Sequence, residues 1–271
     1  MSATFHRSDD LSDASFTGVN LRGATFVGTS LRGARITESD LSGVVMRGVD
    51  VDGVDIDAPW LLEGEKPLRV NGIEVGPYVE AELNGRFPGR AERHATDPGG
   101  LRGAWQVLQG AWSAALDRVA AMPAGTVDVS VDGEWSFAQT LRHLALATDM
   151  WLGKAILRGE QPFHPLGLLD SGTAQDETDA ARDAVTPEAP GPSASPTSGP
   201  AFPEVLEVRA SRVAMVRDFL ASVTSEDLAE ARPNPHNPEY SETVLSCLHT
   251  ILEEEWEHLR FAVRDLDTLQ T

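Results

Sequence analysis

The chain is poor in features that would mark it as a secreted or membrane protein. Its only cysteine among 271 residues is Cys247, which excludes an internal disulfide framework and suits a reducing compartment. No apolar run approaches the roughly 20 residues of a membrane span, and residues 1–6 lack the apolar core of a secretory signal. We therefore expect a cytoplasmic protein without a membrane segment. Cys247 lies among apolar residues and is expected to be a small buried hydrophobe.

The chain is also short of basic residues, with 22 Lys and Arg against 42 Asp and Glu and a net charge of −20. Because phosphate backbones are bound through clustered Lys and Arg, this balance argues against nucleic acid as a direct partner. The acidity mostly favours solubility. Imitation of DNA is the alternative that the next feature raises.

Residues 9–57 repeat with a period of five. A large apolar residue occupies one position of each repeat, a small residue usually stands two positions earlier, and glycine usually stands two positions later. The large residues are Leu11, Phe16, Leu21, Phe26, Leu31, Ile36, Leu41, Met46, Val51 and Ile56. Neither a helix nor a strand has this period, but a coil that turns a corner every five residues does.

This pattern resembles the pentapeptide-repeat family. The resemblance implies a short right-handed quadrilateral β-helix of two to three coils. Such a coil would serve as a stacking scaffold or as a docking surface for a protein partner. Some members of that family mimic DNA and bind gyrase, so binding to a topoisomerase is a further alternative.

Residues 61–96 are expected to form a cap and connector. Asn71-Gly72 predicts a type I′ turn in a short hairpin. Gly76-Pro77 then predicts the start of a short helix through about Asn84. The stretch 86–93, rich in arginine, is expected to be a solvated linker.

From residue 97 the sequence is helical. Apolar residues from Leu101 to Met122 step by three and four, as in a bundle core. A second helix follows with a capping box from Ser136 to Gln139 and runs to about Leu157. Residues 171–200 have the composition of a flexible insertion, a third helix starts near Pro203, and a proline-rich extended crossing leads to the last helix. The expected fold is a four-helix bundle.

The last helix, residues 241–266, carries the run Glu253-Glu254-Glu255-Trp256-Glu257-His258. At about 100° per residue, Glu255 lies near the middle of the apolar face and His258 lies on its edge. A buried carboxylate needs a compensating partner. Glu-x-x-His spacing is how bundle helices present metal ligands, but Glu255 could instead meet a buried arginine, and His258 could be an ordinary structural histidine.

Three segments together resemble the DinB/YfiT-like superfamily: residues 132–144, 162–167 and 247–265. Members are four-helix bundles that often bind a divalent metal through three histidines. Several are transferases or isomerases that use a low-molecular-weight thiol. The resemblance makes His143 the ligand of the second helix. On the last helix, the family's pair of ligands four residues apart can be aligned in two ways. If Arg260 matches the arginine that follows the family's second ligand, the pair falls on Glu255 and Leu259; Leu259 cannot bind a metal, so His258 would substitute. The other register pairs Glu254 with His258 and leaves Glu255 buried without a role.

The predicted architecture is therefore a mixed, two-domain fold. It consists of a β-helix over residues 1–60, a connector over 61–96, and a DinB-like bundle over 97–271 with the insertion 171–200. The metal ligands are predicted to be His143, Glu255 and His258, holding Zn²⁺ or another divalent ion, with Trp151 and Trp256 as wall residues. The expected function is a metal-dependent transferase or hydrolase that acts on a small molecule, with a thiol as cosubstrate. We also expect a homodimer. The alternative is a non-catalytic scaffold with a degenerate metal site.

Overall fold

The structure is a computed structural model that describes residues 4–6, 9–62, 64–168 and 200–270. The chain divides into two compact units, residues 1–43 and 44–271. The predicted flexible insertion 171–200 lies outside the described residues, apart from residue 200.

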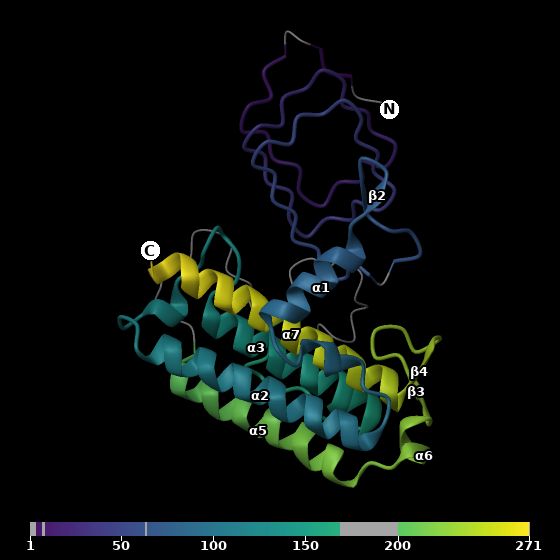
Figure 1. Ribbon diagram of the computed structural model, residues 1–271. Coiled ribbons are helices and arrows are strands. Elements are labelled where there is room, and N and C mark those ends of the chain that lie inside the picture. Colours follow the sequence, from purple (N-terminus) through teal and green to yellow (C-terminus); the bar gives the residue numbers. More distant parts are fainter. Residues whose placement is uncertain (1–3, 7–8, 63, 169–199, 271) are drawn as a thin grey trace. The chain divides into compact units, whose positions relative to one another are not determined.

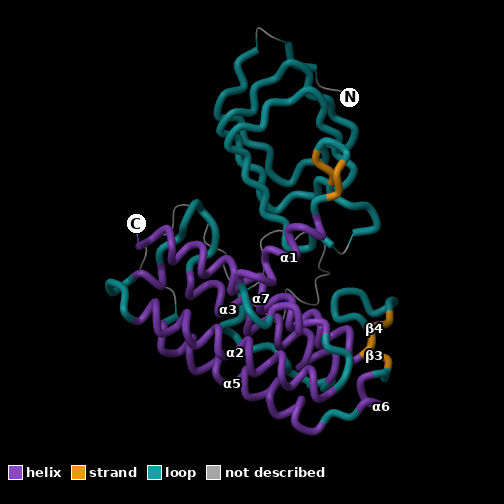
Figure 2. The backbone as a smooth tube through the Cα atoms, in the orientation of Figure 1, coloured by secondary structure: helices purple, strands orange, loops and turns teal. Residues whose placement is uncertain are grey.

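The repeats form a periodic backbone. Turns recur every ten residues, closed for example by hydrogen bonds from Ala24 N to Leu21 O and from Ala34 N to Leu31 O, both 2.9 Å long. The glycines of the repeats, which recur every five residues, have positive φ angles, such as 78° at Gly23. Described residues 9–57 contain no strand and are drawn as loop in Figure 2. Their large apolar side chains are also at least 45% exposed, so the β-helix stays a prediction.

The connector contains the predicted hairpin and helix. Strands β1 (Arg69–Val70) and β2 (Ile73–Glu74) pair antiparallel around Asn71 and Gly72, which have φ angles of 52° and 82° as a type I′ turn requires. Helix α1 (Gly76–Arg86) has proline in its first turn. The prediction of a solvated linker over 86–93 is wrong, because the 3₁₀ segment η1 (Arg90–His94) buries Arg90 and Arg93.

Four long helices form the bundle (Figure 1). They are α2 (Pro98–Ala120), α3 (Phe137–Thr148) with its π-helical continuation η3 (Asp149–Ile156), α5 (Phe202–Ser222) and α7 (Val244–Gln270). Helices α2 and α3 each contact both α5 and α7, so that the four surround one core. Among the described residues, no helix has the length and hydropathy of a membrane span.

The predicted periodicity and caps explain these helices. The core includes Leu101, Leu108, Leu144, Ile251 and Leu259, which are at most 2% exposed. The predicted capping box is present: Ser136 N donates to Gln139 Oε1 at 2.9 Å, and Gln139 N donates to Ser136 Oγ at 3.4 Å. Cys247 is fully buried within this core, as expected.

The second bundle helix departs from a regular α-helix at Asp149. Asp149 is fully buried and receives two hydrogen bonds from Arg212 of α5, at 2.8 Å to Oδ1 and 3.0 Å to Oδ2. It also accepts the backbone N–H of His164 at 2.8 Å. The π-helical segment therefore holds the loop that follows it. Leu168 follows in the same loop, and its carbonyl oxygen lies 3.2 Å from His143 Nδ1.

The expected extended crossing before the last helix is a short hairpin. After α6 (Ser225–Leu228), strand β3 (Ala231–Pro233) pairs antiparallel with β4 (Ser241–Thr243), with Arg232 opposite Glu242. The Lys154 ammonium group donates to Pro235 O at 2.7 Å, which ties the hairpin tip to the π-helical segment.

Candidate metal centre

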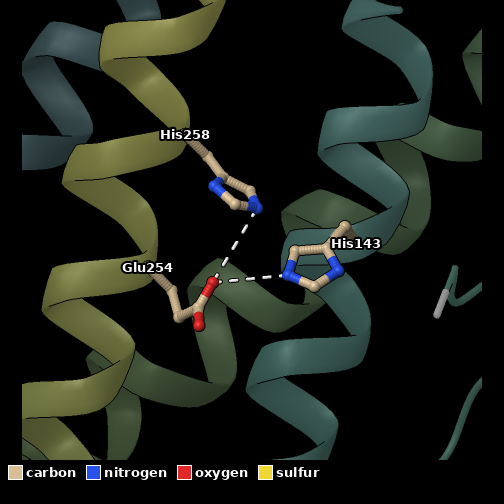
Figure 3. A group of neighbouring side chains, drawn as sticks. All are labelled: His143, Glu254 and His258. Atoms are coloured by element: carbon tan, nitrogen blue, oxygen red, sulfur yellow. Dashed lines mark hydrogen bonds and ion pairs between the residues drawn. The ribbon is translucent and has the colours of Figure 1, made fainter. Parts of the chain in front are cut away.

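Three side chains from two helices converge in the bundle (Figure 3). His143 comes from α3, and Glu254 and His258 lie one turn apart on α7. One ligand atom from each lies within 4.8 Å of the other two. The Glu254 Oε2 atom is 3.3 Å from His143 Nε2 and 3.8 Å from His258 Nε2. Two imidazoles and a carboxylate thus face one point.

The hydrogen bond of His143 to the backbone sets its tautomer. Its Nδ1 atom lies 3.2 Å from Leu168 O, and a carbonyl oxygen can only accept, so Nδ1 carries the proton. His143 Nε2 faces Glu254 Oε2 at 3.3 Å, as a donor when Nε2 is protonated and as an acceptor when it is not. Two acceptors facing each other need a proton or a cation between them. A protein-held histidine with its second nitrogen bonded to a carbonyl is the usual arrangement of a metal-ligating histidine.

His258 has no hydrogen-bond partner on either ring nitrogen among the described residues, and both nitrogens are buried. Burial lowers the pKa of His258 to about 3, so that the ring is neutral at physiological pH. A buried polar atom without a partner costs roughly 1–3 kcal/mol. A metal ion at the point that Nε2 faces would remove this cost.

Glu254 supplies the negative charge. Burial by itself would raise the pKa of Glu254, but the hydrogen bond with His143 and the charges of His258, His143 and His236 outweigh burial and lower it. The carboxylate is therefore ionised at neutral pH. The donor set is one carboxylate and two imidazoles, a combination found in catalytic zinc sites that keep an open position.

Aromatic rings cover one side of this group. The Trp135 ring packs against His143 at a tilt of 39° with centroids 4.6 Å apart, and it makes a T-shaped contact with His258 at 5.9 Å. Phe261 lies 5.8 Å from His258. The side chains of His143, Glu254 and His258 are 14–16% exposed. Trp135 was not among the predicted wall residues, although it stands in the segment that carried the family resemblance.

The prediction of Glu255 as a ligand is wrong. Glu255 does face the core, as its position on the helix indicated, but its Oε2 accepts a hydrogen bond from Arg209 of α5 at 2.5 Å. Glu254, one residue earlier, takes its place beside the histidines, so the i, i+4 register is the one present. A clue existed in the sequence: Arg209 stands among the inward positions of α5 between Leu206 and Val213, where a buried cation needs an acid.

The two predicted wall tryptophans lie elsewhere. Trp256 is 1% exposed, and a carbon of its ring lies 3.9 Å from the place where Gly89 would carry a Cβ, on the connector side of α7. Trp151 packs against His236 at the hairpin tip, with ring centroids 5.5 Å apart. His236 is also among the charges that lower the pKa of Glu254.

Comparison with protein families gives two matches. The family model described as DinB superfamily matches residues 107–262, more than half of the chain. The chain belongs to the DinB superfamily. A second model, pentapeptide repeats, matches eight copies over residues 10–48 of this DinB protein. Searches of the curated proteins and of the solved structures with this chain found no match.

Proposed function

We propose that the bundle is a metal-dependent transferase or hydrolase in which His143, Glu254 and His258 hold a divalent ion. The observation that carries the proposal is the convergence of three ligand atoms within 4.8 Å, with two buried nitrogens of His258 left unpartnered. DinB proteins are typically metal-binding, and this donor set fits a catalytic ion. Zn²⁺ is the ion that we expect first, because it favours imidazole and carboxylate ligands in this number.

The residues around the ion have separable tasks. The Leu168 carbonyl fixes His143 in the tautomer that offers Nε2. The Glu254 carboxylate offsets part of the charge of the ion, and Trp135 and Phe261 keep water from one side. When bound, the ion would supply Lewis acidity that lowers the pKa of a water or thiol ligand. A small substrate, with a low-molecular-weight thiol as cosubstrate, would approach from the partly exposed side.

Metal analysis of the purified full-length protein tests this proposal. Dialysed protein should bind about one equivalent of Zn²⁺, with the stoichiometry measured by inductively coupled plasma mass spectrometry and the affinity by calorimetry. His143→Ala, Glu254→Gln and His258→Ala should each lose at least tenfold in affinity. His6→Ala is the control, because His6 is exposed and lies outside the match to the DinB superfamily. Equal binding by all four variants would refute the site.

For residues 9–57 we propose the right-handed quadrilateral β-helix. The support is the backbone period, in which positive φ angles recur every five residues and turns every ten. Hydrogen exchange on the full-length protein tests it, since coil-to-coil ladders would protect amides throughout this segment. Exchange of these amides at the rates of an unstructured chain would rule the β-helix out.

A further inference from the structure

Helix α7 is attached to the connector by two buried ion pairs. Arg93 Nε donates to Glu253 Oε1 and Arg90 Nη2 donates to Glu257 Oε1, each at 2.9 Å. Both arginines are 3% exposed, and Glu253 and Glu257 are 8% and 2% exposed. Such a pair adds little net stability, because desolvation offsets the attraction, but it can fix the register of the elements that it joins.

The two arginines are themselves held by one carboxylate. Glu80 of α1 accepts from Arg90 Nη1 at 2.7 Å, and its other oxygen lies 2.9 Å from Arg93 Nη1. Arg93 also donates to Arg90 O at 3.2 Å. The guanidinium groups are thus oriented from the side opposite to α7. The connector therefore presents a preorganised pair of donors to α7 and not two flexible side chains.

The paired acids flank the candidate ligands around the helix. At about 100° per residue, with Glu254 at zero, His258 lies near +40°. On the same scale Glu253 and Glu257 lie near −100° and −60°, and Glu255 lies near +100°. Glu253 and Glu257, which are paired with the connector, therefore lie on one side of the candidate ligands around the helix. Arg209 holds Glu255 on the other side.

The two flanking sets of ion pairs restrain rotation of α7 about its axis, together with the packing of its buried apolar residues. Side-chain atoms lie roughly 5–6 Å from the axis, so a rotation of about 10° moves them by about 1 Å. Metal sites tolerate errors of only about 0.2 Å in ligand distance. Loss of the contacts on one flank would therefore spoil the geometry of Glu254 and His258 without unfolding the helix.

We propose that Arg90 and Arg93 are positioning residues of the metal centre, acting through Glu257 and Glu253 on the neighbouring ligands. The proposal rests on the metal-dependent function proposed above. It assigns a role to residues that precede the match to the DinB superfamily, which begins at residue 107. The functional unit then begins no later than Glu80.

Co²⁺ alone, titrated into the metal-free full-length protein, tests the proposal through affinity and the visible spectrum of the bound ion. The double variant Arg93→Met, Glu253→Met removes one pair without leaving a buried charge unpartnered, so the bundle should fold. We expect Co²⁺ affinity to fall about tenfold or more, the range seen for groups that orient metal ligands, with altered absorption bands. Arg118→Met, Asp267→Met is the matched control, because this more exposed pair joins α2 to α7 away from the ligands; it should bind as wild type.

The outcomes separate the two proposals. Wild-type affinity and spectrum in a folded Arg93→Met, Glu253→Met variant would overturn the positioning role and leave the metal site standing. Failure of the wild type to bind Co²⁺ or Zn²⁺ would remove the metal site and the positioning role together. If the double variant does not fold, Arg93→Lys is the alternative, because it keeps the charge but loses the planar guanidinium that contacts Glu253 and Glu80 at once. That variant should bind Co²⁺ at least threefold more weakly, and unchanged binding would again overturn the positioning role.

Discussion

Replacing Arg209 by alanine should strongly destabilise the bundle. Its guanidinium pairs with Oε2 of Glu255, which is 1% exposed and deep in the core, and the other oxygen of Glu255 has no hydrogen-bond partner among the described residues. Removing one member of a buried pair typically costs about 3–5 kcal/mol. Since domains are stable by about 5–15 kcal/mol, this loss is a large fraction of the total.

The loss of unfolding free energy in Arg209→Ala should depend on pH in the way expected for a buried Glu255. Burial already raises the pKa of Glu255 with Arg209 present, and removing the cation raises it further. Above the raised pKa that Glu255 has in the folded wild type, the wild type releases this proton while the folded variant retains it, so the stability deficit of the variant grows with pH there. Below about pH 4.5 Glu255 is protonated in every state, and the deficit is smallest and constant. Arg209→Met combined with Glu255→Met should recover most of the lost stability, because an apolar pair fills the space without desolvation.

Urea denaturation at pH 7 and pH 4 measures both effects. Arg217→Ala is the control, since Arg217 and its partner Asp218 are 65% and 68% exposed, and it should change the free energy of unfolding by less than about 1 kcal/mol. A loss below 1 kcal/mol for Arg209→Ala, or a deficit independent of pH, would refute the assignment of Glu255 as a structural residue.

Two further predictions concern the connector and the core. Burial would raise the pKa of Glu80, but hydrogen bonds from Arg93 and Arg90 outweigh it and lower that pKa to about 2. The free energy of unfolding should therefore fall as the pH drops from 4.5 to 2, and thermal melts of Glu80→Gln should show a smaller fall over this range. Burial raises the pKa of the Cys247 thiol to about 11, so a thiol reagent at pH 8 should label this residue only in denaturant, and labelling of the native protein within minutes would contradict its placement.

The sequence predicted the local structure of the bundle well because its signals are local. The capping box at Ser136, the turn at Asn71-Gly72 and the helix after Gly76 each depend on residues within one or two turns of the chain. All three are present as expected. The apolar spacing from Leu101 onward likewise gave the core face of α2 correctly.

The errors came from pairings between distant segments. Helical phase placed Glu255 in the core, but whether its partner was a metal or an arginine depended on α5, 46 residues away. Arg90 and Arg93 looked like a solvated linker because their acids lie 167 and 160 residues further along the chain. The π-helical winding at Asp149 had no signal in the apolar period either, since it accompanies contacts with Arg212 and the His164 backbone.

X-ray absorption spectroscopy of the zinc-loaded full-length protein tests the proposed centre most directly. The account predicts two imidazole nitrogens at about 2.0–2.1 Å and carboxylate or water oxygens in the remaining positions. His258→Ala should remove one of the two imidazoles from the spectrum. A zinc environment with sulfur, with no imidazole, or unchanged in His258→Ala would contradict the account.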